Sequence, residues 1–249
     1  MRCEFSLDHY LDCLALASDQ GYKLAPVADY MKWKDKDKLL LLRHDVDLSL
    51  DFAYQMASAE CKNGYQSTYY VLLHSPSFSA LSPKGMEMIR AISGQGHEIG
   101  LQVDSRYMIP SEHYILKDIT GKLLRSYAQH FPSITPLHHR MTGFIDSRDI
   151  PIRYISDSGR NWRAGCLCQH IGKIKKLQVL THPIWWCSDS LTREAALEAL
   201  MRDRMSETIQ SVNDFKEIVT TYIRDEIGNG GDSEVDPSGN RWSGIRVQT

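Results

Sequence analysis

The chain has 249 residues, with 29 lysines and arginines against 31 aspartates and glutamates, and hydrophobic residues make up 42% of it. This is the composition of a globular protein and excludes disorder, collagen and coiled coil for the bulk of the chain. The near-neutral charge offers no general basic surface for nucleic acid. No stretch approaches the roughly 20 apolar residues of a membrane-spanning helix. The first residues are partly acidic and unlike a signal peptide, so we expect a cytoplasmic protein.

The six cysteines include no CxxC pair, and disulfides are not expected in a cytoplasmic chain. Cys166 and Cys168, with His170 nearby, suggest zinc. Their spacing is tighter than in the usual structural zinc sites, and no second ligand pair follows. We therefore interpret these cysteines as buried thiols.

Strand-like and helix-like segments alternate along the chain. Leu39–Asp47 is a continuous apolar run that ends in polar residues, which is typical of a buried parallel strand. Apolar residues at helical spacing and β-branched or aromatic runs predict the next elements in the same way. These are a helix over 50–60, a strand over 67–73, a helix over 83–93, a strand over 97–103, a helix near 111–129, strands over 154–156 and 177–181, and a helix from about 192 to 225 with a break near Ser211.

This alternation predicts an α/β protein with parallel strands and helices outside. We expect residues 1–228 to form one domain and residues 229–249, rich in glycine and other breakers, to form a flexible or draped tail. Polar residues gather where the predicted strands end, and this edge of a parallel sheet usually carries the chemistry. The sequence therefore predicts one shared site.

Two aspartates are the most informative residues of that predicted site. Asp45 and Asp47 lie two residues apart on a strand, so their side chains share one face. Carboxylates that close need a cation, a shared proton or an arginine between them, and Arg43 lies on the same face. Asp47 has a structural alternative, because it can cap the helix that follows.

Four short motifs occur in an order that resembles a known family. They are Leu42–Asp47 (LRHDVD), Gly96–Leu101 (GHEIGL), Tyr154–Ser158 (YISDS) and Leu180–Trp186 (LTHPIWW). Together they resemble the polysaccharide deacetylases, which are carbohydrate esterase family 4 with its NodB-homology domain, and the WbmS-like branch of surface-polysaccharide proteins in particular. The resemblance covers roughly residues 5 to 190 and implies a distorted (β/α) barrel that removes an N-acetyl group from a sugar.

The resemblance also implies a role for each matching residue. Asp45 would be the general base, His182 the general acid, and Arg140 the residue that orients the base. Asp47 would bind a divalent metal, with zinc the expected ion. Residues implied to line the sugar pocket are Asp157 and Trp162.

The sequence departs from the family at the remaining metal ligands. Family members carry two histidines four residues apart after the GHEIG strand, where this chain has Gln102 and Arg106. Glutamine is a poor zinc ligand, and arginine does not ligate metals. His97 faces away from Gln102 along the strand and is expected to be hydrogen-bonded in the core.

Three explanations of this departure stay open. A metal binds Asp47 together with a substitute ligand. Alternatively, Arg106 takes the place of the ion, pairing with Asp47 and contacting substrate as an oxyanion forms. Finally, the chain has lost the esterase activity and kept a sugar pocket. The candidate ligands beside Asp47 are His44, Gln102, Asp104 and His74.

Trp185 and Trp186 follow His182 in what we expect to be an extended segment, where alternation points one side chain inward and the other outward. An indole in a cleft suits stacking on a sugar ring, so we expect Trp185 to contact the substrate.

The sequence thus predicts a hydrolase that acts on an acetylated amino sugar, nucleotide-linked or lipid-linked, in surface-polysaccharide biosynthesis of the O-antigen type. Nucleic acid is not expected as a partner. Two alternatives remain, a sugar-binding protein without catalysis and a metal-independent amidohydrolase on the same barrel.

Overall fold

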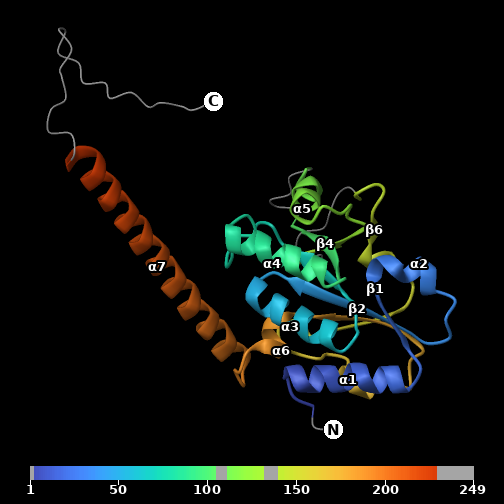
Figure 1. The fold of residues 1–249 in the computed structure, drawn as a ribbon. Coiled ribbons are helices and arrows are strands. Elements are labelled where there is room, and N and C mark those ends of the chain that lie inside the picture. Colours follow the sequence, from blue (N-terminus) through green and yellow to red (C-terminus); the bar gives the residue numbers. More distant parts are fainter. Residues whose placement is uncertain (1–2, 105–110, 132–139, 229–249) are drawn as a thin grey trace. The chain divides into compact units, whose positions relative to one another are not determined.

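The computed structural model describes residues 3–104, 111–131 and 140–228 (Figure 1). The chain divides into two compact units, residues 1–201 and residues 202–249. The described strands all belong to the first unit. The tail predicted over 229–249 lies outside the described residues.

The helices and strands follow one another in a largely alternating order. They are α1 (Leu7–Asp19), β1 (Lys23–Pro26), α2 (Tyr30–Trp33), β2 (Leu39–Val46), α3 (Leu50–Lys62), β3 (Thr68–Val71), α4 (Pro83–Gly94), β4 (Glu98–Val103), α5 (Glu112–Thr120), β5 (Ser126–Gln129), β6 (Ile145–Asp146), β7 (Arg153–Ser156), β8 (Lys176–Thr181), α6 (Pro183–Cys187) and α7 (Arg193–Gly228).

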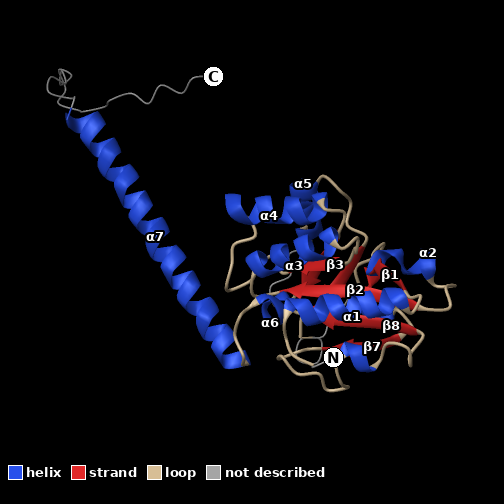
Figure 2. Cartoon of the chain, turned by 60° about the horizontal axis from the view of Figure 1, so that its bottom comes forward, coloured by secondary structure: helices blue, strands red, loops and turns tan. Residues whose placement is uncertain are grey.

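The described strands form one parallel sheet in the order β6-β5-β4-β3-β2-β8-β7, and β1 pairs with the first half of β2. The sheet curves round on itself, because Ser147, just after β6, accepts hydrogen bonds from Arg43 on β2 (2.9 Å) and Gln178 on β8 (3.1 Å). Helices cover the outside of the strands (Figure 2). The predicted α/β class is confirmed as a distorted barrel, with β6 and β7 not paired to each other in the described residues.

Strand β2 is buried along its whole length and has neighbours on both sides, which explains its uninterrupted apolar run. Leu40 and Leu42 belong to the core cluster that includes residues of α1, whereas Leu39 and Leu41 pack with Tyr70 in another cluster. The same alternation continues into the polar residues, so consecutive side chains of β2 enter two different environments.

The outer face of β2 carries a buried ionic cluster centred on Glu60 of α3. Glu60 is fully buried and both of its carboxylate oxygens accept hydrogen bonds. Burial alone would raise the pKa of Glu60, but the charge and hydrogen bond of His44, with His97 and Ser67, lower the pKa to about 2. The donors are Tyr10 Oη (2.5 Å), His44 Nε2 (3.0 Å), Ser67 Oγ (2.6 Å) and Tyr69 Oη (2.7 Å).

Most predicted elements are present, and two differ. The helix predicted near 111–129 is shorter: α5 stops before Gly121, whose φ of 69° suits glycine, and β5 follows. The break predicted near Ser211 is absent, because α7 is continuous. His97 is a buried core histidine, as expected, and its Nε2 bonds the Ala57 carbonyl oxygen at 3.0 Å. In the described part of the chain, no helix is long and apolar enough to cross a membrane.

Candidate active site

Acidic and imidazole side chains collect at the carboxyl ends of five strands, at one edge of the barrel. Each of these residues lies at the end of its strand or directly after it, as parallel α/β folds generally place their functional groups. They are Asp45 and Asp47 from β2, Asp104 after β4, His130 after β5, Asp157 after β7 and His182 after β8.

His182 is partly buried and pairs with the fully buried Asp157. The Nδ1 atom of His182 donates to Asp157 Oδ1 at 2.6 Å, and the other carboxylate oxygen accepts from the backbone N–H of His182 at 3.1 Å and from Trp186 Nε1 at 2.7 Å. Burial alone would lower the pKa of His182, but the charge and hydrogen bond of Asp157 raise it to about 9, with help from Asp47 and Asp45. His182 therefore carries a proton at neutral pH.

We expect the His182 imidazole of the metal-free protein to titrate near pH 9 in a proton NMR experiment. Asp157→Asn removes the largest influence that raises the pKa of His182, so the midpoint falls, because only Asp47 and Asp45 then oppose the effect of burial. His97, whose pKa burial lowers, serves as the internal control and keeps its midpoint in the variant. A wild-type midpoint below pH 7 would contradict the assignment.

His130 lies between two carboxylates. Its Nδ1 is 3.3 Å from Asp104 Oδ2, and its Nε2 is 3.7 Å from Asp47 Oδ2. Burial alone would lower the pKa of His130, but hydrogen bonds with Asp47 and Asp104 raise it. Sequence reasoning missed His130, because it follows a strand of only four residues. A histidine directly after a strand is the signal that would have pointed to it.

Asp45 is held by an arginine of its own strand. Arg43 donates from Nε to Oδ1 at 2.9 Å and from Nη2 to Oδ2 at 3.0 Å, a bidentate pair buried at 4% and 5% exposure. The amide nitrogen of Gln102 also donates to Asp45 Oδ2, at 3.3 Å, while its buried Oε1 has no hydrogen-bond partner among the described residues. Arg43 thus pairs with Asp45, whereas the ion pairs described for Asp47 are with His130 and His182.

Other predicted site residues lie elsewhere or contact different partners. Arg140 is exposed and pairs with Asp149, so the structure does not bring it to Asp45, whose partner is Arg43. Arg106 lies outside the described residues. His44 faces Glu60 on the outer side of β2, because neighbouring strand residues point to opposite faces.

The substitute ligand His74 pairs with Glu112 at 2.6 Å. The tryptophans do not alternate along an extended segment, because α6 begins at Pro183 and is helical. Trp185 is buried, with its ring centroid 6.5 Å from that of His182. Trp162 packs against Trp186 at 6.0 Å between centroids.

The residues around Asp47 fit a divalent metal. Asp47 Oδ2 lies 3.7 Å from His130 Nε2 and 4.0 Å from His182 Nε2. Tetrahedral zinc with bonds of about 2.0–2.2 Å separates neighbouring nitrogen and oxygen ligands by roughly 3.3–3.6 Å, so a small movement would bring Asp47 and either histidine to ligand spacing. The Nδ1 atom of each histidine is held by a carboxylate, Asp104 or Asp157, as is usual for metal-binding histidines. His130, rather than His44 or Gln102, is thus the ligand that the structure places beside Asp47.

No protein-family model matches the chain, and no curated protein matches it in sequence. Solved structures with some likeness include the peptidoglycan deacetylase PdaC of Bacillus subtilis, at 14% identity and a TM-score of 0.44, covering 77% of this chain and 98% of that one. A chitin deacetylase from the fungal pathogen Colletotrichum lindemuthianum aligns at 13% identity and a TM-score of 0.42, covering 68% of this chain and 84% of that one.

A family 4 carbohydrate esterase pseudoenzyme from Bacillus anthracis aligns at 15% identity and a TM-score of 0.40. That alignment covers 69% of this chain and 62% of the pseudoenzyme, so this chain matches less than two thirds of its length. At this level of similarity the likenesses do not decide the function.

Proposed function

We propose that this protein is a polysaccharide deacetylase-like hydrolase that removes an N-acetyl group from an amino sugar. The observation that carries the proposal is the cluster in which His130 and His182 lie beside Asp47, next to the clamped carboxylate of Asp45. Amide hydrolysis needs a base for water and an acid for the departing amine, and this cluster contains a candidate for each. The four sequence motifs support an acetylated sugar as the substrate class.

In this proposal, Asp47 and His130 hold a divalent ion, while His182 stays outside the ligand set and acts as the general acid. When bound, the ion would polarise the acetyl carbonyl and lower the pKa of a water molecule. Asp45 accepts the proton of the attacking water, while Arg43 keeps its carboxylate oriented. The C–N bond then breaks as His182 gives its proton to the leaving nitrogen, and acetate and the free amine are released.

We further propose that the reaction belongs to surface-polysaccharide biosynthesis of the O-antigen type. The sugar would be deacetylated while it is attached to a nucleotide or a lipid. This part rests on the resemblance of the motifs to WbmS-like proteins.

One observation favours a second function, sugar binding without turnover. Both oxygens of Asp45 are already engaged by Arg43, and Gln102 adds a further donor to one of them. With both oxygens engaged, this carboxylate has fewer free lone pairs with which to accept the proton of an attacking water. Saturable binding of N-acetylated sugars without acetate release would support this second function and contradict the first.

The proposed function is tested by measuring acetate release from N-acetylglucosamine and from UDP-N-acetylglucosamine, with zinc, with cobalt and after chelation. We expect metal-dependent release, with a loss of at least about 100-fold in Asp47→Ala and in His130→Ala. His74→Ala is the matched control, because its imidazole pairs with Glu112 instead, and it should retain activity within a few-fold. Release that survives chelation would identify a metal-independent amidohydrolase instead.

A further inference from the structure

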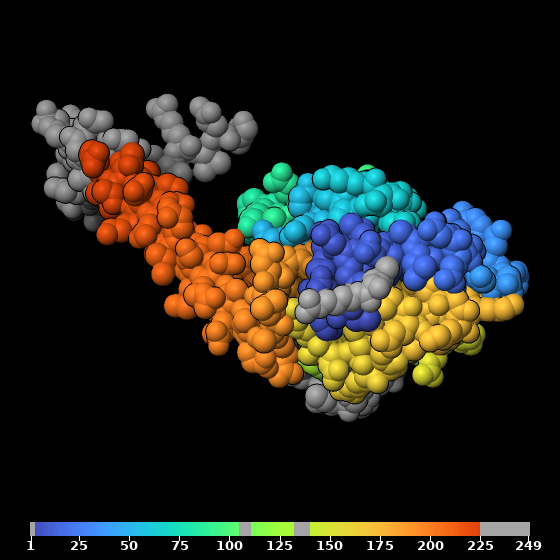
Figure 3. Space-filling view, turned by 90° about the horizontal axis from the view of Figure 1, so that it is seen from below, coloured from blue at the N-terminus to red at the C-terminus, as the bar shows by residue number. Residues whose placement is uncertain are grey.

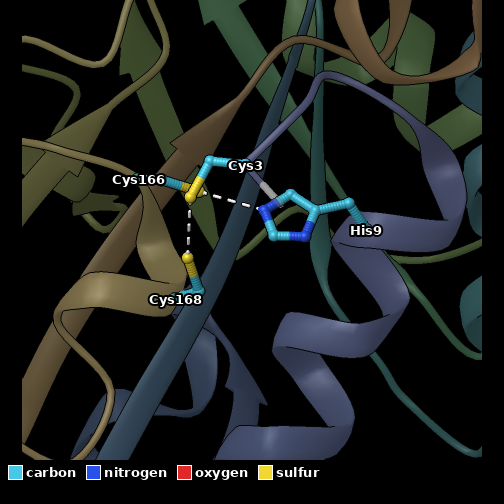
Figure 4. Close-up of side chains that lie close together, drawn as sticks. All are labelled: Cys3, His9, Cys166 and Cys168. Atoms are coloured by element: carbon cyan, nitrogen blue, oxygen red, sulfur yellow. Dashed lines mark hydrogen bonds between the residues drawn. The ribbon is translucent and has the colours of Figure 1, made fainter. Parts of the chain in front are cut away.

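A second group of potential metal ligands lies apart from the carboxylates and imidazoles of the candidate active site. It consists of Cys3, His9, Cys166 and Cys168, and one potential ligand atom of each lies within 4.8 Å of those of all the others (Figure 4). The sulfur atoms of Cys3 and Cys168 are 3.3 Å apart, and His9 Nε2 is 3.3 Å from Cys166 Sγ. Four soft or borderline donors are thus gathered around one point.

Three separate stretches of chain supply these donors. Cys3 comes from the segment before α1, and His9 from the first turn of α1, which Ser6 caps by accepting the His9 N–H at 3.2 Å. Cys166 and Cys168 come from a short 3₁₀ turn between β7 and β8, a connection with little regular structure. Figure 3 shows α1, in dark blue, lying against residues of the β7–β8 region, in yellow.

The spacing of the four donors fits a tetrahedral zinc ion better than a disulfide. Zinc with sulfur at about 2.3 Å and nitrogen at about 2.0 Å separates two sulfurs by roughly 3.8 Å and a sulfur from a nitrogen by roughly 3.5 Å. The distances of 3.3 Å, with every pair within 4.8 Å, lie around these values. A disulfide instead needs sulfurs about 2.05 Å apart.

The donor types indicate the same ion. Three thiolates and one imidazole form a common structural zinc set, and thiolate ligands favour zinc over magnesium or calcium. His9 is almost fully buried, and the neighbours of its Nε2 are the sulfurs of Cys166 and Cys13, at 3.3 and 3.8 Å. Such weak acceptors satisfy a buried ring nitrogen poorly, whereas a metal bond would satisfy it fully.

We propose that Cys3, His9, Cys166 and Cys168 bind one structural zinc ion, in a site distinct from the candidate active site. This reverses the sequence-based interpretation of Cys166 and Cys168 as plain buried thiols. His170 was the wrong partner to consider, because its Nε2 faces the Ala164 carbonyl oxygen at 2.8 Å. The true partners come from the other end of the chain, more than 150 residues away.

The zinc would cross-link the N-terminal segment, α1 and the β7–β8 connection. Because the unfolded chain lacks a preformed site, metal binding adds directly to folding stability. The His9 ring also stacks on Trp186 at 6.3 Å between centroids, and Trp186 donates to Asp157. The proposed zinc site would therefore help to hold Trp186 and Asp157, which position His182, without taking part in the reaction.

The test is elemental analysis of untagged protein purified without chelator, comparing wild type with Cys3→Ser and Cys166→Ser. We expect each variant to lose one zinc equivalent per chain, whereas the matched control Cys61→Ser, at an exposed cysteine of α3, loses none. Asp47→Ala keeps this equivalent, which separates the site from any metal at the candidate active site. Cys3 is exposed and outside regular structure, so Cys3→Ser tests the proposal even if Cys166→Ser fails to fold.

A second readout uses cobalt in place of zinc. Thiolate-to-cobalt charge-transfer absorption should appear in the wild type and in Asp47→Ala, and should be reduced in Cys3→Ser. Zinc content that is unchanged in both cysteine variants would overturn the proposal. So would a Cys3–Cys168 disulfide, found by mass spectrometry in protein purified with zinc and without added oxidant.

Discussion

Asp45→Asn is expected to lower kcat/KM for acetate release by about 10²- to 10⁴-fold, the usual contribution of a general base. Asparagine keeps the shape of the side chain but cannot accept the proton of the attacking water. Binding of the N-acetylated sugar should change by only a few-fold, because the proposed role is in the chemical step. Steady-state acetate release and sugar binding by calorimetry together provide the measurement.

The substitution also leaves Arg43 buried without its counter-charge, which costs stability, so a control for folding is needed. The chain offers a matched pair, in which Arg148 donates to both oxygens of buried Asp146 at 3.1 and 2.7 Å with the same two-residue spacing. Asp146→Asn should lose less stability, because the Arg148 side chain is 39% exposed, and it should keep turnover. Equal losses of turnover in the two variants would assign Asp45 a structural role instead.

Glu60→Ala should destabilise the fold by about 3–5 kcal/mol, as expected when one partner of a buried ionic cluster is removed. Four donors, including His44 and Tyr10, then lose their acceptor in a site without water access. Urea unfolding followed by circular dichroism measures this loss at pH 7.

The pH dependence of the loss has a definite sign. The pKa of Glu60 is held at about 2, below the value of the unfolded chain, so its stabilisation is fully present above about pH 4.5 and disappears as the pH falls toward 2. Wild type and Glu60→Ala should therefore converge in stability over this acid range.

Glu98 provides the contrast, because burial raises its pKa and it is hydrogen-bonded to hydroxyls rather than to imidazoles. We expect Glu98→Gln to cost less than Glu60→Gln, since a group that is closer to neutral resembles an amide. A larger cost at Glu98 would mean that the Glu60 cluster is not the main ionic anchor of the fold.

The parts of the fold that the sequence predicted well are those in which burial is apolar. Leu39–Val46 reads as a strand because both of its faces are covered by hydrophobic neighbours. The sequence predicts a helix for the residues of β5, because Ser126–Gln129 is short and has polar residues at both ends. It is buried all the same, since Ser126 donates to Glu98 inside the barrel, at 2.7 Å. Where the side chains that face the barrel interior are polar, a strand has no alternating apolar pattern by which the sequence could identify it.

The sequence predicted which residues of the candidate site lie at strand ends, but not which of these residues contact one another. The positions of Asp45, Asp47, Asp157 and His182 follow from where their strands end. The contact between His130 and Asp47 depends on how β5 and β2 are placed across the barrel, which is a property of the assembled sheet. The cysteine and histidine cluster depends on the N-terminal segment meeting residues 166–168, a long-range contact that spacing along the chain does not encode.

Strand β2 contributes residues to two separate polar clusters, the candidate active site on one face and the Glu60 cluster on the other. Its alternation sends Arg43 and Asp45 into the barrel and His44 toward Glu60. Inserting or deleting one residue within the strand would exchange the two faces, so that the arginine and aspartate met the glutamate cluster and the histidine entered the site. We therefore expect the length of β2 to stay constant during evolution. Insertions and deletions should occur in the surrounding loops instead.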